Sequence, residues 1–223
     1  MINEKIATEK FNLACKLYVE AKEVIRELTS YVKTAYPDFS FEIAMKQFDL
    51  ILQGVLLRTA AEDGYFLEEE RLFIEKITDY GNIISYFNKK GVSVSWDIFT
   101  SFSNEDLKDF SLKLLVALKD LADNFVTPFA MVDSKLPKDY CEILTEKMVF
   151  ICLSLAQCDG DSIESPDFRS EGVVATTLIN KIIKEKWNEI KSQNVQTNEQ
   201  NKSETTSRSN SLKANFLKKK TLT

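Results

Sequence analysis

The chain has 223 residues, of which 44% are hydrophobic, and it carries a formal net charge of −5. This length, with 15 phenylalanines, is sufficient for one hydrophobic core with appendages. Histidine is absent, which removes the usual general base near neutral pH and excludes imidazole-based catalytic triads and most zinc or copper sites. Any bound metal is therefore expected to be a hard, oxygen-coordinated cation.

Charge is divided unevenly along the chain. Residues 194–223 contain six basic and two acidic residues, a net of +4, which leaves −9 on residues 1–193. Phosphate contacts dominate nucleic-acid affinity, so an acidic body predicts no nucleic-acid partner. The four cysteines form no C-x-x-C pair, nothing in the sequence reads as a secretory signal, and no apolar run reaches the roughly 20 residues of a membrane-spanning helix. We therefore expect reduced, buried thiols, no transmembrane segment and a cytoplasmic location.

The elements are predicted to be helical throughout. Glycine and proline are scarce, with six and four residues, and apolar residues recur at helical spacing. In the first helix the apolar positions from Phe11 to Val32 alternate steps of three and four, and Pro37 ends the run. This pattern predicts an N-terminal helical arm over residues 1–36. Its apolar seam is expected to pack against the body in preference to a second copy of the chain.

The middle of the chain predicts three helices and an irregular segment. A helix over residues 41–62 runs into Asp63-Gly64, and the next helix begins near Glu68 with three glutamates in its first turn. Residues 81–101 are predicted to form a loop with helical turns. A long helix follows Ser103, and Pro128 and Pro137 are expected to bracket the connection after it.

The last part of the body repeats this plan. A helix over residues 138–158 runs into Asp159-Gly160, and Ser165 and Pro166 predict the N-cap and first position of a helix that reaches residue 191. Residues 37–192 are thus expected to form one compact domain with two helix–Asp-Gly–helix units. Residues 193–223 are rich in Ser, Thr, Asn, Gln and Lys, which predicts a disordered basic tail.

The two Asp-Gly corners are the best functional signal in the sequence. A carboxylate near the C-terminal end of a helix is disfavoured by roughly 0.3 to 1 kcal/mol unless a positive charge compensates it. Calcium prefers six to eight oxygen ligands and magnesium an octahedral set, so either cation suits clustered carboxylates. Neither corner has the residue order of an EF-hand, and a single Asp-Gly pair is also an ordinary turn. The candidate metal ligands are Asp63, Glu70, Asp159, Asp161 and Asp167.

The first corner resembles a known family signature. Residues 60–71 read Ala-Ala-Glu-Asp-Gly-Tyr-Phe-Leu-Glu-Glu-Glu-Arg, which is similar to the A-x-A-D-G-x-hydrophobic-x-x-x-E motif of the TerB family of bacterial tellurite-resistance proteins. Asp63, Gly64, Phe66 and Glu70 match it. The resemblance covers residues 41–191, and Leu67 departs from it by replacing the usual helix-capping Ser, Thr or Asp, so the corner is expected to lack its capping box.

The second corner departs further from the motif. Asp159 and Gly160 match it, but Ile163 lies one residue late. Phe168 stands where the motif glutamate is expected, and Asp167 or Glu164 are the possible substitutes.

The resemblance implies a compact helical domain whose acidic motif residues bind a divalent cation. It also implies a sensor or adaptor role with a protein partner in bacterial stress response or phage defence, without catalysis. A metal-free protein-interaction module is the first alternative, and a metal-dependent hydrolase is a weaker one. The basic tail is the candidate for a weak contact with an anionic surface, either on a partner or on the acidic body.

Overall fold

The computed structural model describes residues 2–62, 66–99, 101, 104–158 and 165–194. Over these residues the protein is all-α, as predicted, and contains no strand. None of the helices within these ranges is long and apolar enough to cross a membrane. The predicted disordered tail falls outside the described residues from residue 195 onward.

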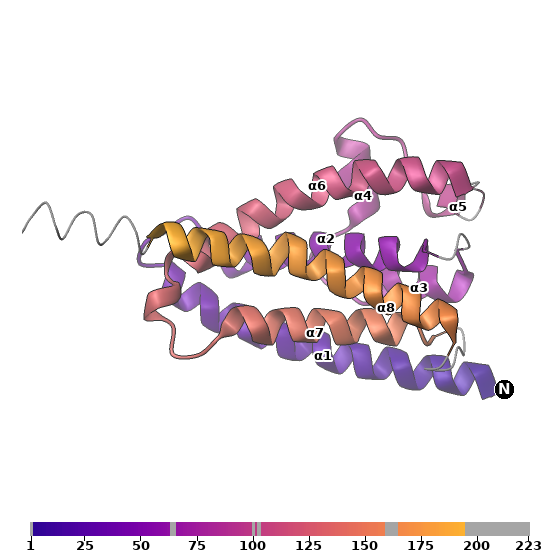
Figure 1. Ribbon diagram of the computed structural model, residues 1–223, viewed down its shortest axis with the longest axis horizontal. Helices are drawn as coiled ribbons and strands as arrows, with labels where there is room; N and C mark the ends of the chain where they lie inside the picture. Colours follow the sequence, from indigo (N-terminus) through magenta and orange to yellow (C-terminus); the bar gives the residue numbers. More distant parts are fainter. Residues whose placement is uncertain (1, 63–65, 100, 102–103, 159–164, 195–223) are drawn as a thin grey trace, which may run out of the picture.

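The helices follow the predicted order closely. The elements are α1 (Ile2–Val32), α2 (Phe41–Ala60), α3 (Glu68–Lys76), α4 (Ile83–Lys89), α5 (Trp96–Phe99), α6 (Asn104–Met131), a 3₁₀ turn (Asp133–Lys135), α7 (Tyr140–Leu155) and α8 (Pro166–Ile179). After α8 the chain passes through a π-helical segment, Asn180–Lys184, and stays helical over residues 185–194. In Figure 1, α1, α7 and α8 run along the long axis of the molecule, and α6 diverges from α8 toward the end where α1 begins.

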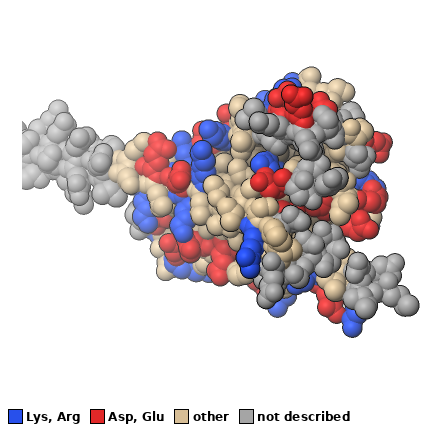
Figure 2. Space-filling view, turned by 45° about the vertical axis from the view of Figure 1, so that its right-hand side comes forward, with Lys and Arg blue, Asp and Glu red and all other residues tan. Residues whose placement is uncertain are grey.

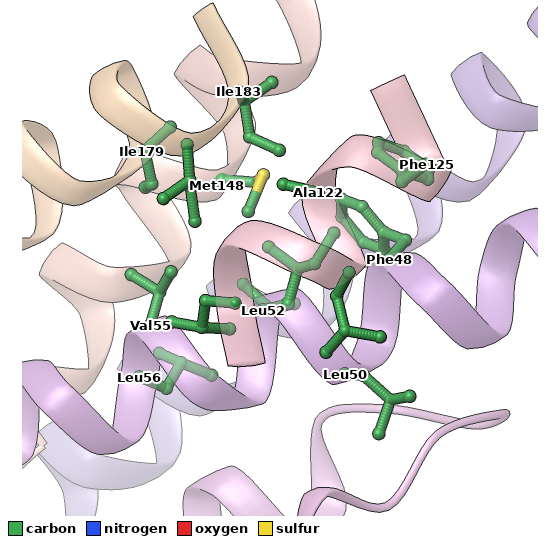
Figure 3. Close-up of a cluster of buried hydrophobic side chains, with 14 of the residues drawn as sticks. Phe48, Leu50, Leu52, Val55, Leu56, Ala122, Phe125, Met148, Ile179 and Ile183 are labelled. Carbon is green, nitrogen blue, oxygen red and sulfur yellow. The ribbon is translucent and has the colours of Figure 1, made fainter. Parts of the chain in front are cut away.

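Helix α2 is the centre of the fold. It is apolar on almost every side, which is typical of a helix surrounded by other helices, and it packs against α6, α8, α1 and α7. Figure 3 shows its side chains meeting those of three neighbouring helices and the π-helical segment. The labelled members of this cluster are Phe48, Leu50, Leu52, Val55, Leu56, Ala122, Phe125, Met148, Ile179 and Ile183.

The N-terminal helix belongs to the same core. Its seam is buried and packs chiefly against α7, so the seam lies on the body, as favoured from the sequence. Ion pairs join the two helices at Glu20 with Lys147 (2.6 Å), and Glu27 also pairs with Lys138 (2.9 Å) just before α7. The helix predicted as an arm therefore lies along the bundle. The buried seam consists of Ala14, Tyr18, Ala21, Ile25, Leu28 and Val32.

Two local predictions are resolved by the structure. Residues 81–101 contain the helical turns α4 and α5, as expected. The prediction that Pro128 begins a connection is wrong, because α6 continues through Pro128 to Met131. A proline inside a helix removes one backbone hydrogen bond and costs about 3 kcal/mol. The buried side chains of Phe125 and Phe129 on either side offset this cost by packing in the core.

Candidate functional site

The first predicted corner is described up to Glu62 and again from Phe66. Glu62 pairs with Arg58 one helical turn earlier at 2.6 Å, and Asp63 lies outside the described residues. Beyond the corner, the buried carboxylate of Glu70 accepts a hydrogen bond from the backbone N–H of Leu67 at 2.7 Å. This is one half of a capping box, so the expectation that the box is missing is only half right. The leucine side chain, which has no oxygen, cannot supply the other half.

Two other glutamates of α3, Glu68 and Glu75, pair with a cation of their own helix. Arg71 donates to Glu68 at 2.7 Å and to Glu75 at 2.9 Å. These hydrogen bonds from the guanidinium lower the pKa of the Glu68 carboxyl. Glu69 is exposed and faces a pocket described below. One arginine thus serves two glutamates, and the described part of this corner remains acidic overall.

An aromatic cluster holds the exit of the first corner. The ring of Phe66 is buried and lies parallel to Trp96, with centroids 6.3 Å apart, and contacts Phe99 at 5.8 Å. Phe99 in turn packs against Phe110 of α6 at 4.8 Å. The ring of Phe66, two residues after Gly64 in the sequence, thus faces inward. The corner is anchored to α5 and α6 by this contact.

The second predicted corner is described only at its two ends. Helix α7 ends at Leu155, and Cys158 is buried in the turn that follows it. Residues 159–164, which include Asp159 and Asp161, lie outside the described residues. Ser165 caps α8 by accepting a hydrogen bond from Phe168 N–H at 3.1 Å, which confirms the predicted N-cap. Asp167 lies in the first turn of α8, but its side chain is not among those that the structure describes.

The described flanks of both corners face one pocket. It has a volume of about 240 Å³ and a mostly apolar lining, and it lies between the N-terminal half of α1, helix α3 and Cys158. Its lining includes Phe11 and Phe73, whose rings meet edge to face at 5.4 Å, together with Glu69 and Lys76. In Figure 1, α2 and α7 end, and α3 and α8 begin, at the same end of the molecule. Figure 2 turns that end forward and shows acidic and basic side chains intermixed over the described surface.

The described residues alone do not assemble a metal centre. Among them, no three or more Asp, Glu or Cys side chains are grouped as a metal ion would require. Of the predicted ligands, only the Glu70 side chain is described, and one of its oxygens serves the cap at Leu67. Asp63, Asp159, Asp161 and the side chain of Asp167 lie outside the described residues.

A buried carboxylate that the sequence analysis did not single out lies in the middle of α2. Asp49 is fully buried, and its carboxylate accepts hydrogen bonds from Tyr18 Oη (2.8 Å), Tyr80 N–H (2.6 Å) and Gly81 N–H (3.0 Å). Tyr18 Oη in turn accepts from Asp79 N–H at 3.1 Å. Burial raises the pKa of Asp49 to about 6, although the three hydrogen bonds oppose the rise.

One turn later, the side-chain amide of Gln53 also hydrogen-bonds to the segment between α3 and α4. Its Nε2 donates to Thr78 Oγ1 at 2.6 Å, and its Oε1 accepts from Ile83 N–H at 2.7 Å. Asp49 and Gln53 together satisfy the backbone of the loop between α3 and α4. The available signal was two polar residues four positions apart within the otherwise apolar stretch of residues 48–57.

The comparisons leave the family open. No family model, curated protein or solved structure gives a significant match to this chain.

Proposed function

We propose that this protein is a non-enzymatic, TerB-like helical domain that binds a divalent cation, calcium or magnesium, at its two acidic corners. The ligands in this proposal are Asp63, Glu70, Asp159, Asp161 and Asp167. The proposal places the protein in the cytoplasm as a sensor or adaptor for a protein partner in bacterial stress response or phage defence. The observation that carries it is the pocket lined by both Glu69 and Cys158.

That pocket supports the proposal because two of its lining residues are adjacent in the sequence to proposed ligands. Glu69 directly precedes Glu70, and Cys158 directly precedes Asp159. A ligand pair drawn from the two corners therefore needs no large rearrangement of the described helices. Both aspartates follow helix C-terminal ends, where the negative end of the helix dipole favours a cation. The four cysteines are free, and three of them are buried, which supports a cytoplasmic location.

Tryptophan fluorescence can test whether the protein binds a cation. The chain has two tryptophans. Trp96 stacks on Phe66 beside the first corner, and Trp187 is buried against Phe129 near the C-terminal end of α6. In a Trp187→Phe variant, fluorescence would report on Trp96 alone. We expect calcium or magnesium to change this fluorescence in a saturable manner and to raise the melting temperature, because a ligand that binds only the folded state stabilises it.

The ligand assignment is tested by matched variants. Asp63→Asn with Asp159→Asn should weaken cation affinity at least about tenfold, which corresponds to 1.4 kcal/mol. Asp38→Asn with Asp120→Asn removes two exposed carboxylates elsewhere and should leave affinity unchanged. Calorimetry provides the measurement. Equal affinity in both double variants would refute the assignment.

One observation favours a second candidate, a metal-free interaction module. The described carboxylates Glu62, Glu68, Glu70 and Glu75 all have partners within the protein, so helix capping and local ion pairs account for them without a metal. The same titration separates the two functions. A folded protein that gives no calorimetric heat and no change in melting temperature with either cation would support the metal-free module.

A further inference from the structure

The apolar pocket between α1 and α3 is too small for most cofactors. Pockets for drug-sized ligands typically measure about 300 to 1,000 Å³. The volume here is about 240 Å³, and much of the lining is the apolar surface of Ala7, Phe11, Leu72 and Phe73. Such a pocket fits one or two apolar side chains of a peptide.

Charge around the pocket favours a basic peptide. Helix α3 contains four glutamates against Arg71 and Lys76, and both Glu69 and Lys76 line the pocket. The body as a whole carries −9 over residues 1–193. A segment with apolar side chains flanked by lysines would therefore place its apolar groups in the pocket and its cations beside the net acidic helix α3.

The chain itself contains such a segment. Phe216 and Leu217 lie between Lys213 on one side and Lys218, Lys219 and Lys220 on the other. We propose that this segment, residues 213–220, docks in the pocket of its own chain, with the Phe216 or Leu217 side chain against Phe11 and Leu72. This inference does not depend on cation binding.

The segment can reach the pocket. The described chain ends at residue 194, at the opposite end of the long axis from the start of α1 (Figure 1). The helical stretch over residues 166–194 spans roughly 43 Å at 1.5 Å per residue. Residues 195–216 can extend to roughly 70 Å at about 3.3 Å per residue. The link is long enough, but it must be more extended than an average coil, so the docked state should be weak and salt-sensitive.

The test uses the full-length chain labelled with ¹⁵N. Amide chemical shifts of Ala7, Thr8 and Leu72 are compared between the wild-type protein and a Phe216→Ser, Leu217→Ser variant at low salt. We expect these three amides to differ between the two proteins. Leu222→Ser, which removes an apolar residue of the same tail outside the docking segment, should match the wild type.

A reciprocal variant fills the pocket. Ala7→Leu adds apolar volume at the pocket lining and is compatible with a helix. It should shift the amides of residues 213–220 toward those of an isolated peptide of residues 210–223. Identical amide shifts at Ala7, Thr8 and Leu72 in the wild type and the Phe216→Ser, Leu217→Ser variant would overturn the proposal. Tail-dependent shifts that fall on about tenfold dilution would also overturn it, because they would assign the pocket to the tail of a second copy.

Discussion

At the scale of single residues, Asp49 shows how a polar side chain can organise an apolar core. Its carboxylate satisfies two backbone N–H groups of the α3–α4 loop and the Tyr18 hydroxyl of α1, so one buried group joins three segments. Removing any of these hydrogen-bonding partners would leave a buried polar group unsatisfied, at a cost of about 1 to 3 kcal/mol. The arrangement is structural and is separate from the acidic corners.

The raised pKa of Asp49 predicts a pH-dependent stability. Between its ordinary pKa of 3.8 and the folded value of about 6, the folded state binds a proton that the unfolded state does not. Stability from this group therefore rises as the pH falls through 6, and the full gain of about 3 kcal/mol is present once the pH is below 3.8. The carboxyls of Glu20 and Glu27, whose pKa values are lowered by lysine partners and by Tyr140, act in the opposite direction.

Asp49→Asn isolates this contribution. The amide oxygen can still accept from Tyr80 and Gly81, but the group no longer titrates. The difference in free energy of unfolding between the wild type and the variant should therefore move in favour of the wild type by about 2 kcal/mol from pH 7 to pH 4.5. Urea denaturation at a series of pH values measures it. A difference that stays constant over this range would contradict a raised pKa.

The limit of sequence reasoning at this scale is clear from Asp49 and Glu70. Their residue types are visible in the sequence, and Asp49 stands four positions before Gln53 within an apolar stretch of α2. Which backbone groups they satisfy depends on how α1 and the α3–α4 loop fold against α2, and periodicity does not contain that information. Glu70 was selected as a metal ligand by motif, whereas its cap to Leu67 follows from local helix geometry.

At the scale of elements, the contact between α2 and α6 depends on one glycine. A Cβ atom on Gly54 would lie 2.5 Å from Cδ2 of Leu118 and 3.3 Å from Cδ1 of Leu114. Both leucines are buried in the core and have little room to move. Gly54 therefore allows α2 and α6 to approach closely, and this close contact offsets the poor helix propensity of glycine.

Gly54→Ala should destabilise the protein by about 1 to 3 kcal/mol, because overpacking outweighs the gain in helix propensity. Gly172→Ala is the matched control, since it also replaces a glycine inside a helix. Its Cβ would meet only the end of the Leu153 side chain, at 3.1 Å, and that side chain is only partly buried. Thermal melting should show Gly172→Ala within about 0.5 kcal/mol of the wild type or more stable. Equal effects of the two substitutions would contradict the packing argument.

Helix existence was predictable because apolar spacing and caps are local signals. Ser165 and Pro166 located the start of α8 for this reason. The continuation of α6 through Pro128 was not predictable, since it depends on tertiary packing of the turns around the proline. The π-helical segment Asn180–Lys184 has no local signal either. It precedes Trp187, whose Nε1 donates to Asp133 at 2.8 Å, and that contact between distant segments is visible only in the folded chain.

At the scale of the whole molecule, the position of α1 makes it part of the same domain as the other helices. Its spacing of apolar residues resembled a coiled-coil seam, and a seam alone does not identify the surface that covers it. In the structure the cover is α7 and α2, and Tyr18 also reaches the buried carboxylate of Asp49. The helix therefore contributes both apolar and polar contacts to the body.

Deleting residues 1–36 should consequently unfold the protein or reduce it to a non-cooperative state. The deletion exposes the faces of α2 and α7 that α1 covers and leaves Asp49 without its Tyr18 hydrogen bond. Circular dichroism melting of residues 37–223 provides the measurement, with a synthetic peptide of residues 2–36 added in a second experiment. Restored cooperative melting in the presence of the peptide would show that the loss comes from the missing contacts.

Cooperative folding without α1 would contradict this prediction. A chain of residues 37–223 that melts cooperatively at the wild-type temperature would show that α1 is a dispensable arm. Light scattering then separates the remaining possibilities: a full-length dimer that becomes a folded monomer on deletion would assign the seam to a second copy. With six side chains of the seam buried on the body and ion pairs at Glu20 and Glu27, we expect neither result. Burial of an apolar helix face of this length contributes more than the stability margin of a typical domain, so the remaining helices should not hold the fold without it.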